Sequence, residues 1–143
     1  RLNTVGADLG ERGFVRAGTD VTGFGLLGHL GSMCRASGVG AEINANRLPA
    51  IAREVFQLIA RDCIPGGSRE NLKTADAFVE WNGVSDAQKF LLADAQTSGG
   101  LLLCVAPRRL EAVLKLLRKQ NAICAVTIGR VVASRKARIR VSE

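Results

Sequence analysis

The chain contains the run Thr19-Asp20-Val21-Thr22-Gly23-Phe24-Gly25-Leu26-Leu27-Gly28-His29, which joins a carboxylate and two hydroxyls to glycines that open an apolar helix. Glycine in a helix is unfavourable by about 1 kcal/mol relative to alanine, so the missing side chains must serve a purpose. We expect Gly23 and Gly25 to adopt positive φ angles and to bring backbone N–H groups against a ligand. Gly28 and Gly31, three residues apart on one helix face, would let a neighbouring backbone approach closely.

The start of this helix suits an anion, because helix N-termini present unpaired N–H donors and a partial positive charge. Asp20 does not itself favour a phosphate, so we expect its carboxylate to hold a divalent cation that bridges to phosphate oxygens. The alternative is an ordinary helix N-terminus that Asp20 or Thr22 caps, with the glycines kept for packing. Spacing alone favours neither interpretation.

The 143 residues are enough for one domain with its own core, without the help of disulfide bonds. The four cysteines include no Cys-x-x-Cys pair and the chain has one histidine, so we expect reduced, mostly buried thiols and no zinc site. Reduced thiols suit the cytoplasm. No apolar run approaches the ~20 residues of a membrane span, and no signal peptide is recognisable. The start at Arg1, without an initiator methionine, indicates a fragment or a trimmed product.

The net charge of +7 comes almost entirely from the C-terminal end of the chain. Residues 108–143 carry ten Lys and Arg against two Glu, whereas residues 1–107 carry ten basic and eleven acidic residues. A basic segment can attract nucleic acid, but aromatic residues that would stack on bases are almost absent from it. Its basic residues between Arg130 and Arg140 alternate with apolar or small ones, as on the exposed face of an edge strand. We therefore do not expect nucleic-acid binding.

Hydrophobic periodicity and turn residues predict an α+β fold in which helices pack against a mixed sheet. The expected helices cover residues 24–37, ended by a left-handed Gly38, then a segment around Val55, residues 85–92 behind a Ser85/Gln88 capping box, and a segment from Pro107. The expected strands are residues 39–43, 77–81, 101–105 as a central strand, 122–128 and 137–141. Residues 63–71, which contain Pro65-Gly66-Gly67-Ser68, are expected to form a loop.

Two further polar glycine segments stand out, Gly66-Gly67-Ser68-Arg69 and Thr97-Ser98-Gly99-Gly100. Each can form an anion-binding nest, and Arg69 could add a bidentate contact to a phosphate or carboxylate. Glycine and serine fill ordinary turns at least as often, so a single segment would be weak evidence. Three such segments in one chain favour an anion site.

Catalysis by this chain alone is not expected, because it has no P-loop, dinucleotide-binding motif or nucleophile elbow. Magnesium would need a second carboxylate or a nucleotide beside Asp20. Asp94 is a candidate, although a helix-end or turn role is the more common use of such a residue. His29 has no companion ligand or nucleophile nearby in the sequence, so we expect it to be packed or hydrogen-bonded.

Three motifs give the chain a close resemblance to the C-terminal domain of the selenide, water dikinase family, the selenophosphate synthetases, within the aminoimidazole ribonucleotide synthetase-like superfamily. They are TDVTGFGLLGH at residues 19–29, PGGSREN at residues 65–71 and DAQTSGGLL at residues 94–102. The first is highly specific, since the related cyclo-ligases and hydrogenase-maturation proteins share only its looser pattern. The sequence departs from the family at Ala95, where proline is usual, and at Ser68, where threonine is common.

The resemblance implies an ATP-dependent enzyme that converts selenide, ATP and water into selenophosphate, AMP and orthophosphate in the cytoplasm. Asp20 would be a magnesium ligand beside carboxylates from the N-terminal half. That half would also carry the catalytic cysteine or selenocysteine, the lysine and a glycine-rich segment, so no catalytic residue is assigned within this chain. Members of the family are generally homodimers.

The sequence therefore predicts that residues 1–143 are a single C-terminal domain that forms one wall of a magnesium-nucleotide phosphoryl-transfer site, with the N-terminal ATP-binding domain absent. The predicted nucleotide contacts are Thr22, Gly23, Thr97, Ser98, Gly99 and Gly100, and the predicted metal ligand is Asp20. Mg²⁺ is the expected cofactor, ATP and selenide are the expected substrates of a homodimeric whole enzyme, and no membrane partner is expected. The alternatives are a non-catalytic anion-binding module, or the same domain of a cyclo-ligase or hydrogenase-maturation protein.

Overall fold

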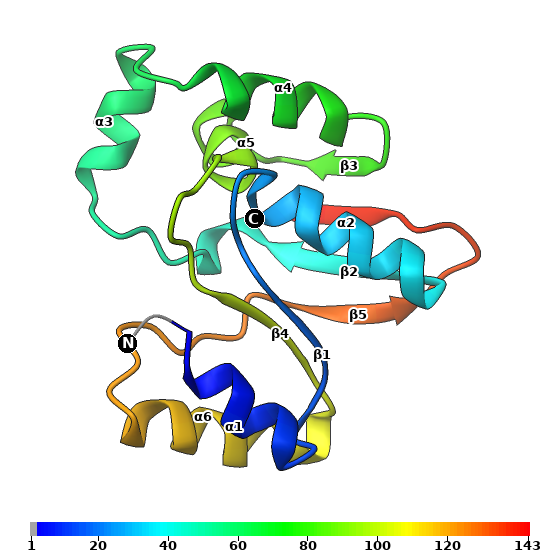
Figure 1. Cartoon of the computed structure of the whole chain (residues 1–143). Helices are drawn as coiled ribbons and strands as arrows, with labels where there is room; N and C mark the ends of the chain where they lie inside the picture. The colour runs from blue at the N-terminus through cyan, green and yellow to red at the C-terminus, as the bar shows by residue number, and fades with distance from the viewer. Residues whose placement is uncertain (1–2) are drawn as a thin grey trace.

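The computed structural model describes residues 3–143 and has the predicted α+β architecture (Figure 1). Its larger sheet has four strands in the order β3-β6-β2-β5. These strands are β2 (Val39–Asn44), β3 (Val79–Asn82), β5 (Gly129–Ala133) and β6 (Ile139–Ser142). The strand β6 pairs in parallel with β2 and β3, whereas β5 pairs antiparallel with β2. The sheet is therefore mixed.

One face of this sheet is covered by the helices α2 (Gly25–Ser37), α4 (Gly66–Ala75) and α5 (Asp86–Ala93). Along β6, Ile139 and Val141 are fully buried, whereas the alternate residues are exposed. The core also takes Leu27 and Leu30 from α2 and Leu92 from α5. Burial of each such aliphatic side chain contributes about 1.5–3 kcal/mol. The hydrophobic effect thus fixes three helices against the sheet, and with them the loops at their ends.

A second layer is built around an antiparallel ribbon of β1 (Val15–Asp20) and β4 (Leu101–Val105), which runs toward the helices α1 (Val5–Glu11) and α6 (Leu110–Lys119) in the lower part of Figure 1. A short 3₁₀ turn, η2 (Pro107–Arg109), leads into α6. Leu9 of α1 and Val113 of α6 are buried outside the main core cluster. The ribbon therefore connects the main core to a smaller one.

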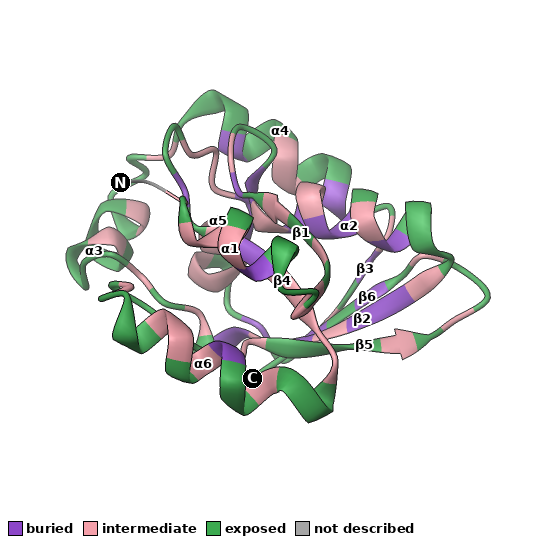
Figure 2. Cartoon of the chain, turned by 60° about the horizontal axis from the view of Figure 1, so that its bottom comes forward, coloured by how far each residue is buried: buried purple, intermediate pink, exposed green. Residues whose placement is uncertain are grey.

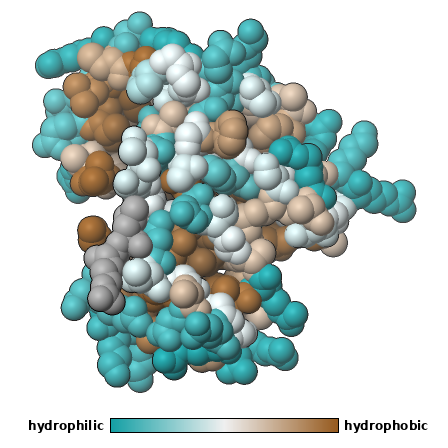
Figure 3. All heavy atoms as spheres, viewed as in Figure 1, coloured by the Kyte–Doolittle hydropathy of each residue, from teal (hydrophilic) through white to brown (hydrophobic). Residues whose placement is uncertain are grey.

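Most of the segment between β2 and α4 lies on the surface, although Ala45 is buried in the main core. It contains a 3₁₀ turn, η1 (Ala45–Arg47), and the helix α3 (Glu54–Ala60), which has no buried residue and shows no purple in Figure 2. Ile51, Phe56 and Leu58 are exposed around α3, and Figure 3 shows a hydrophobic patch at the upper left, where Figure 1 places this helix. Within residues 3–143, no helix has the length and apolarity needed to cross a membrane.

Local sequence signals are confirmed where they were strongest. The helix α2 ends at Gly38, whose φ of +63° is left-handed. Ser85 and Gln88 form the predicted capping box: the Ser85 hydroxyl accepts from the Gln88 N–H at 3.3 Å, and the Gln88 side chain accepts from the Ser85 N–H at 3.0 Å. The predicted strands at residues 39–43, 77–81 and 137–141 match β2, β3 and β6 with small shifts at their ends.

The predicted loop at residues 63–71 is wrong beyond Pro65, because α4 begins at Gly66. The Pro65 carbonyl accepts from the backbone N–H groups of Ser68 and Arg69, which closes the first turn. Two glycines in a helical segment cost about 1 kcal/mol each. Hydrogen bonds made by the buried Ser68 side chain to residues far along the chain oppose this local preference.

Several other expectations are corrected. Residues 101–105 form a strand, but β4 lies in a two-stranded ribbon rather than at the centre of a sheet. Residues 122–128 are not a strand, and β5 starts at Gly129, where a Cβ would lie 2.0 Å from the Glu42 carbonyl oxygen. The helix after Pro49 begins only at Glu54, and the helix expected from Pro107 starts as a 3₁₀ turn. The helix α1 and the strand β1 lie before residue 24, where no element is expected from the sequence.

Candidate functional site

Two of the three motifs meet where the β1–β4 ribbon ends. Asp20, the last residue of β1, pairs with Leu101, the first residue of β4. Beyond this pair, the Val21 N–H donates to the Gly100 carbonyl at 2.9 Å, and the Gln96 N–H donates to the Thr22 carbonyl at 3.2 Å. The turn at residues 20–25 and the loop at residues 94–100 therefore form one hydrogen-bonded unit.

Two glycines allow this close approach. A Cβ on Gly99 would lie 2.1 Å from the Val21 carbonyl oxygen, a distance that real Cβ atoms do not reach. Gly25 has a φ of +66°, and a Cβ there would lie 2.7 Å from the Ala93 carbonyl carbon at the end of α5. The expectation of a positive φ is thus confirmed for Gly25. It is wrong for Gly23, which is not among the glycines with positive φ.

The glycines further along α2 make room for side chains rather than for a backbone. A Cβ on Gly28 would lie 2.8 Å from the Phe24 Cβ, and one on Gly31 would lie 2.8 Å from the Phe78 ring. The predicted close approach of a neighbouring backbone therefore occurs at Gly25 instead. Small residues in α2 let aromatic rings pack against it.

The third motif joins the unit through α4. The Asn71 side-chain amide donates to the Gly23 carbonyl at 2.8 Å and to the Ala93 carbonyl at 3.0 Å. Both donor hydrogens of one amide group thus connect the turn at residues 20–25 to the end of α5.

Ser68 makes a second connection from α4. Its hydroxyl, in a side chain only 1% exposed, donates to the Asp94 carboxylate and accepts from the Ala95 N–H, both at 3.0 Å. Asp94 is also the C-terminal cap residue of α5. It therefore has a helix-end role, which is the more common use of such a residue. Ser68 and Asn71 are three residues apart on one face of α4, a spacing that could have suggested a shared polar contact.

His29 connects the first turn of α2 back to the preceding motif. Its Nε2 lies 3.1 Å from the Thr22 backbone nitrogen, which donates to it, and 3.1 Å from the Thr22 hydroxyl. The cap residue of α2 is Phe24, which makes no side-chain capping bond, so neither Asp20 nor Thr22 caps this helix. His29 is hydrogen-bonded as expected, but its partner could not be predicted from sequence.

The assembled loops leave a carboxylate and backbone donors without partners. Asp20 is exposed, and its side chain has no hydrogen bond or ion pair within residues 3–143. In the same part of the chain, the backbone N–H groups of Gly23, Thr97 and Ser98 have no hydrogen-bond acceptor. A carboxylate suits Mg²⁺, and free N–H groups suit the oxygens of an anion.

The side chains at this place supply only part of a metal-binding site. No group of three or more His, Cys, Asp or Glu side chains in the described part of the chain is placed to hold a metal ion. Arg69, considered above as an anion ligand, forms an ion pair with Asp62 at 2.7 Å and lies over the Phe90 ring. Asp20 is therefore the one side chain of the predicted set that suits a cation, and a magnesium ion held there needs further oxygen ligands.

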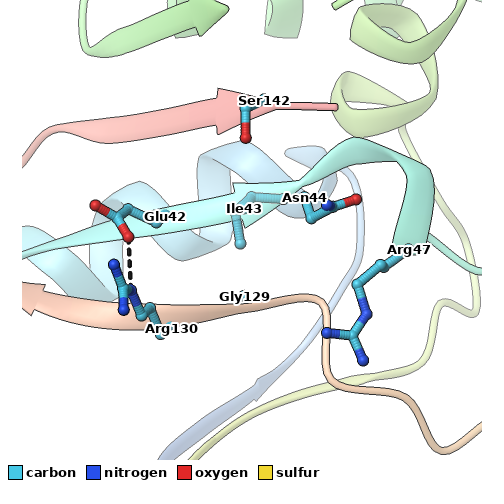
Figure 4. A pocket seen from close by; sticks show the side chains of 7 residues that line it. All are labelled: Glu42, Ile43, Asn44, Arg47, Gly129, Arg130 and Ser142. Carbon is cyan, nitrogen blue, oxygen red and sulfur yellow. Dashed lines mark hydrogen bonds and ion pairs between the residues drawn. The ribbon is translucent and has the colours of Figure 1, made fainter.

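A hollow of about 300 Å³ lies elsewhere, on the uncovered face of the four-stranded sheet (Figure 4). Its lining includes Asn44, Arg47 and Ser142, and Glu42 and Arg130, which form an ion pair at 2.6 Å. The hydrogen bond from Arg130 holds the pKa of Glu42 below its ordinary value. This hollow shares no residue with the predicted nucleotide and metal contacts.

Three of the ten basic residues between residues 108 and 143, namely Arg130, Arg138 and Arg140, form ion pairs on this sheet face. Glu42 also pairs with Arg140, and Glu80 pairs with Arg138 at 3.3 Å. Arg130 lies on the edge strand β5 as the sequence predicts, but Arg140 lies on β6 in the interior of the sheet. The alternation of charged and apolar residues reflects the exposed face of the sheet and not its edge.

Comparison with known proteins finds relatives of this chain in sequence and in fold. The family described as "AIR synthase related protein, C-terminal domain" matches residues 2–142. A protein named selenide, water dikinase from Photorhabdus laumondii is 38% identical over 141 residues, which are 99% of this chain and 40% of that protein. A protein of the same name from Yersinia pestis is 41% identical over 143 residues, again 99% of this chain and 40% of the relative.

Solved structures share the fold at lower sequence identity. The crystal structure of thiamine-monophosphate kinase from Stenotrophomonas maltophilia superposes with a TM-score of 0.64 at 23% identity, over 96% of this chain and 35% of that one. T. maritima PurL, solved with FGAR, has a TM-score of 0.57 at 14% identity, over 94% of this chain and 17% of that one. These likenesses concern the fold alone, and the chain spans about two fifths of the curated relatives it matches.

Proposed function

This chain belongs to the family of AIR synthase related C-terminal domains, and from that premise we propose that residues 1–143 are the C-terminal domain of a selenide, water dikinase. The reaction would convert selenide, ATP and water into selenophosphate, AMP and orthophosphate. The proposal is supported by relatives of that name with 38–41% identity over 99% of the chain. Thiamine-monophosphate kinase and PurL share the fold at far lower identity, which favours the selenium enzyme over other members of the superfamily.

The domain would form one wall of a magnesium-nucleotide site. The observation that carries this proposal is the exposed, unpaired Asp20 carboxylate at the place where all three motifs are joined by hydrogen bonds. Asp20 would bind Mg²⁺, and the remaining ligands would come from carboxylates of the N-terminal domain and from ATP phosphates. Magnesium would neutralise charge on the phosphates during transfer.

Each predicted nucleotide contact would use the groups that the fold leaves free. Gly23, Thr97 and Ser98 would donate their backbone N–H groups to phosphate oxygens. Thr22 would contribute its hydroxyl oxygen, since both of its backbone polar groups are already paired and the hydroxyl, which lies 3.1 Å from His29 Nε2, keeps its oxygen lone pairs free. Gly99 and Gly100, whose carbonyls accept from Asn3 and Val21, would supply a close backbone approach. Catalysis by the whole enzyme would then rest on positioning and on electrostatic stabilisation.

Two experiments test this proposal. In the full-length enzyme, Asp20→Asn is expected to abolish magnesium-dependent selenophosphate formation, followed by phosphorus NMR. Asp86→Asn, which changes an exposed carboxylate paired only with Lys89, is the matched control and should retain activity. The isolated 143-residue chain is expected neither to bind ATP tightly nor to turn it over. Selenophosphate made by this chain alone would contradict the proposed division of the site.

The main rival is a non-catalytic module that binds anions through the glycine loops and the basic tail. The ion pairs on the sheet face disfavour it, because Glu42 and Glu80 offset two of the three positive charges of Arg130, Arg138 and Arg140. Titration with ATP separates the two: the module would bind without magnesium and lose affinity steeply with salt. We further propose a cytoplasmic homodimer for the whole enzyme, with no membrane or nucleic-acid partner.

A further inference from the structure

The contact between His29 and Thr22 determines which tautomer the neutral imidazole adopts. A backbone N–H can only donate, so the nitrogen that faces it must accept. Nε2 therefore carries no proton, and the neutral ring carries its proton on Nδ1. The Thr22 hydroxyl, also 3.1 Å from Nε2, is a second donor to the same nitrogen. This arrangement commits the only histidine of the chain to a structural bond with the motif that contains Asp20.

This contact fixes the Val21–Thr22 peptide, and other hydrogen bonds fix the Thr22–Gly23 peptide that follows it. Its N–H is held by His29, and its carbonyl accepts from the N–H groups of Gln96 and Gly25. One residue further, the Gly23 carbonyl is held by Asn71, while the Gly23 N–H remains without an acceptor within residues 3–143. The Val21–Thr22 peptide that His29 holds lies in the chain between Asp20 and the Thr22–Gly23 peptide that carries this free N–H. The position of the N–H relative to Asp20 therefore depends on the peptide that His29 holds.

We propose that His29 is a positioning residue of the phosphoryl-transfer site, which acts through Thr22 and does not touch the substrate. The inference rests on the proposed function, because it assumes that Asp20 and Gly23 bind a magnesium-phosphate group together. The N-cap residue Phe24 makes no side-chain capping bond, and the hydrogen bond from Thr22 N–H to His29 ties the first turns of α2 to the chain that precedes the helix. Loss of the bond would misplace Gly23 relative to Asp20 while leaving both groups in the chain.

This role is tested in the full-length enzyme by substitutions of His29 that place a hydrogen-bond acceptor at different distances from the backbone. Glutamine carries an oxygen about where Nε2 lies, whereas asparagine carries one about where Nδ1 lies. We expect His29→Asn and His29→Ala to raise the magnesium-ATP concentration for half-maximal rate about 2- to 10-fold, as for one lost hydrogen bond. His29→Gln should stay close to the wild type. Ser32→Ala, which removes a hydroxyl bonded within the same helix, is the control and should have no effect.

Amide hydrogen exchange at Thr22 separates this inference from the proposed function. Exchange should accelerate in His29→Ala and His29→Asn but not in His29→Gln or Asp20→Asn. Faster exchange with an unchanged magnesium-ATP requirement would overturn the positioning role and leave the proposed function standing. Wild-type magnesium dependence in Asp20→Asn would overturn the proposed function and the positioning role with it. If His29→Ala fails to fold, ¹⁵N NMR of the wild-type ring decides, because a proton on Nε2 would refute the inference directly.

Discussion

Gly25 offers a sharp test of how the turn and the end of α5 fit together. Its φ of +66° is unfavourable for any residue with a Cβ, at about 1–2 kcal/mol. The methyl group of Gly25→Ala would also lie 2.7 Å from the Ala93 carbonyl carbon and 3.0 Å from the Asp94 carbonyl oxygen. These are backbone atoms, which cannot move aside as a flexible side chain would. Such overpacking costs a further amount of about 1–3 kcal/mol. We expect Gly25→Ala to lower the free energy of unfolding by about 2–5 kcal/mol.

Gly23, two residues earlier in the same turn, is the matched control. A Cβ there meets nothing within 4 Å, and its φ is not positive. Gly23→Ala is therefore expected to change stability by less than about 0.5 kcal/mol, or to increase it by restricting the unfolded chain. Urea denaturation followed by far-UV circular dichroism gives both free energies from one linear extrapolation. Equal midpoints for the two variants would refute the assignment of Gly25 as the point of backbone contact.

Three further predictions concern interactions away from this turn. Asn71→Asp replaces an amide that donates to two carbonyl oxygens with a carboxylate, so we expect the free energy of unfolding in the urea experiment to fall by about 2 kcal/mol or more. A wild-type midpoint would argue against the connection that Asn71 makes between Gly23 and Ala93. The hydrogen bond from Arg130 lowers the pKa of Glu42, so the folded state favours the ionised carboxylate. This ionisation stabilises the folded state above the ordinary pKa of 4.5, and the stabilisation is lost as the pH falls through the lowered pKa. Glu42→Gln should therefore lower the melting temperature at neutral pH but not at a pH where Glu42 is protonated, and a pH-independent difference would contradict this. Burial raises the pKa of the thiols of Cys34 and Cys104, so both should react slowly with a thiol reagent at pH 8. The exposed Cys63 and Cys124 should react at once, and four equally fast thiols would contradict this prediction.

Elements defined by local signals could be predicted from the sequence. The left-handed Gly38 and the Ser85 capping box involve residues within a few positions of each other, so a short window contains the whole cause. The helix α4 could not be predicted, because its glycines favour a loop and the bonds from Ser68 that oppose them reach residues 26 and 27 positions away. The run at residues 101–105 shows the converse limit, since its apolarity predicts a strand but not its partner.

The candidate site also has features that could be predicted from the sequence and features that could not. The three motifs could be recognised from their residue types, and Asp20 could be singled out as a carboxylate beside glycines. Their assembly could not be predicted, because Asn71 joins residues 48 and 22 positions away and because the need for Gly99 arises from the Val21 carbonyl. The assignment of metal and nucleotide contacts stays a prediction that the experiments above test.

The absence of space between Gly99 and Val21 has an evolutionary consequence. Neither loop can lengthen or gain bulk by itself, because the opposing main chain already occupies the room that the change would need. Inherited variation in one loop must therefore be accompanied by variation in the other. Descendants of this domain that acquire a new substrate should therefore carry substitutions in both loops within the same lineage.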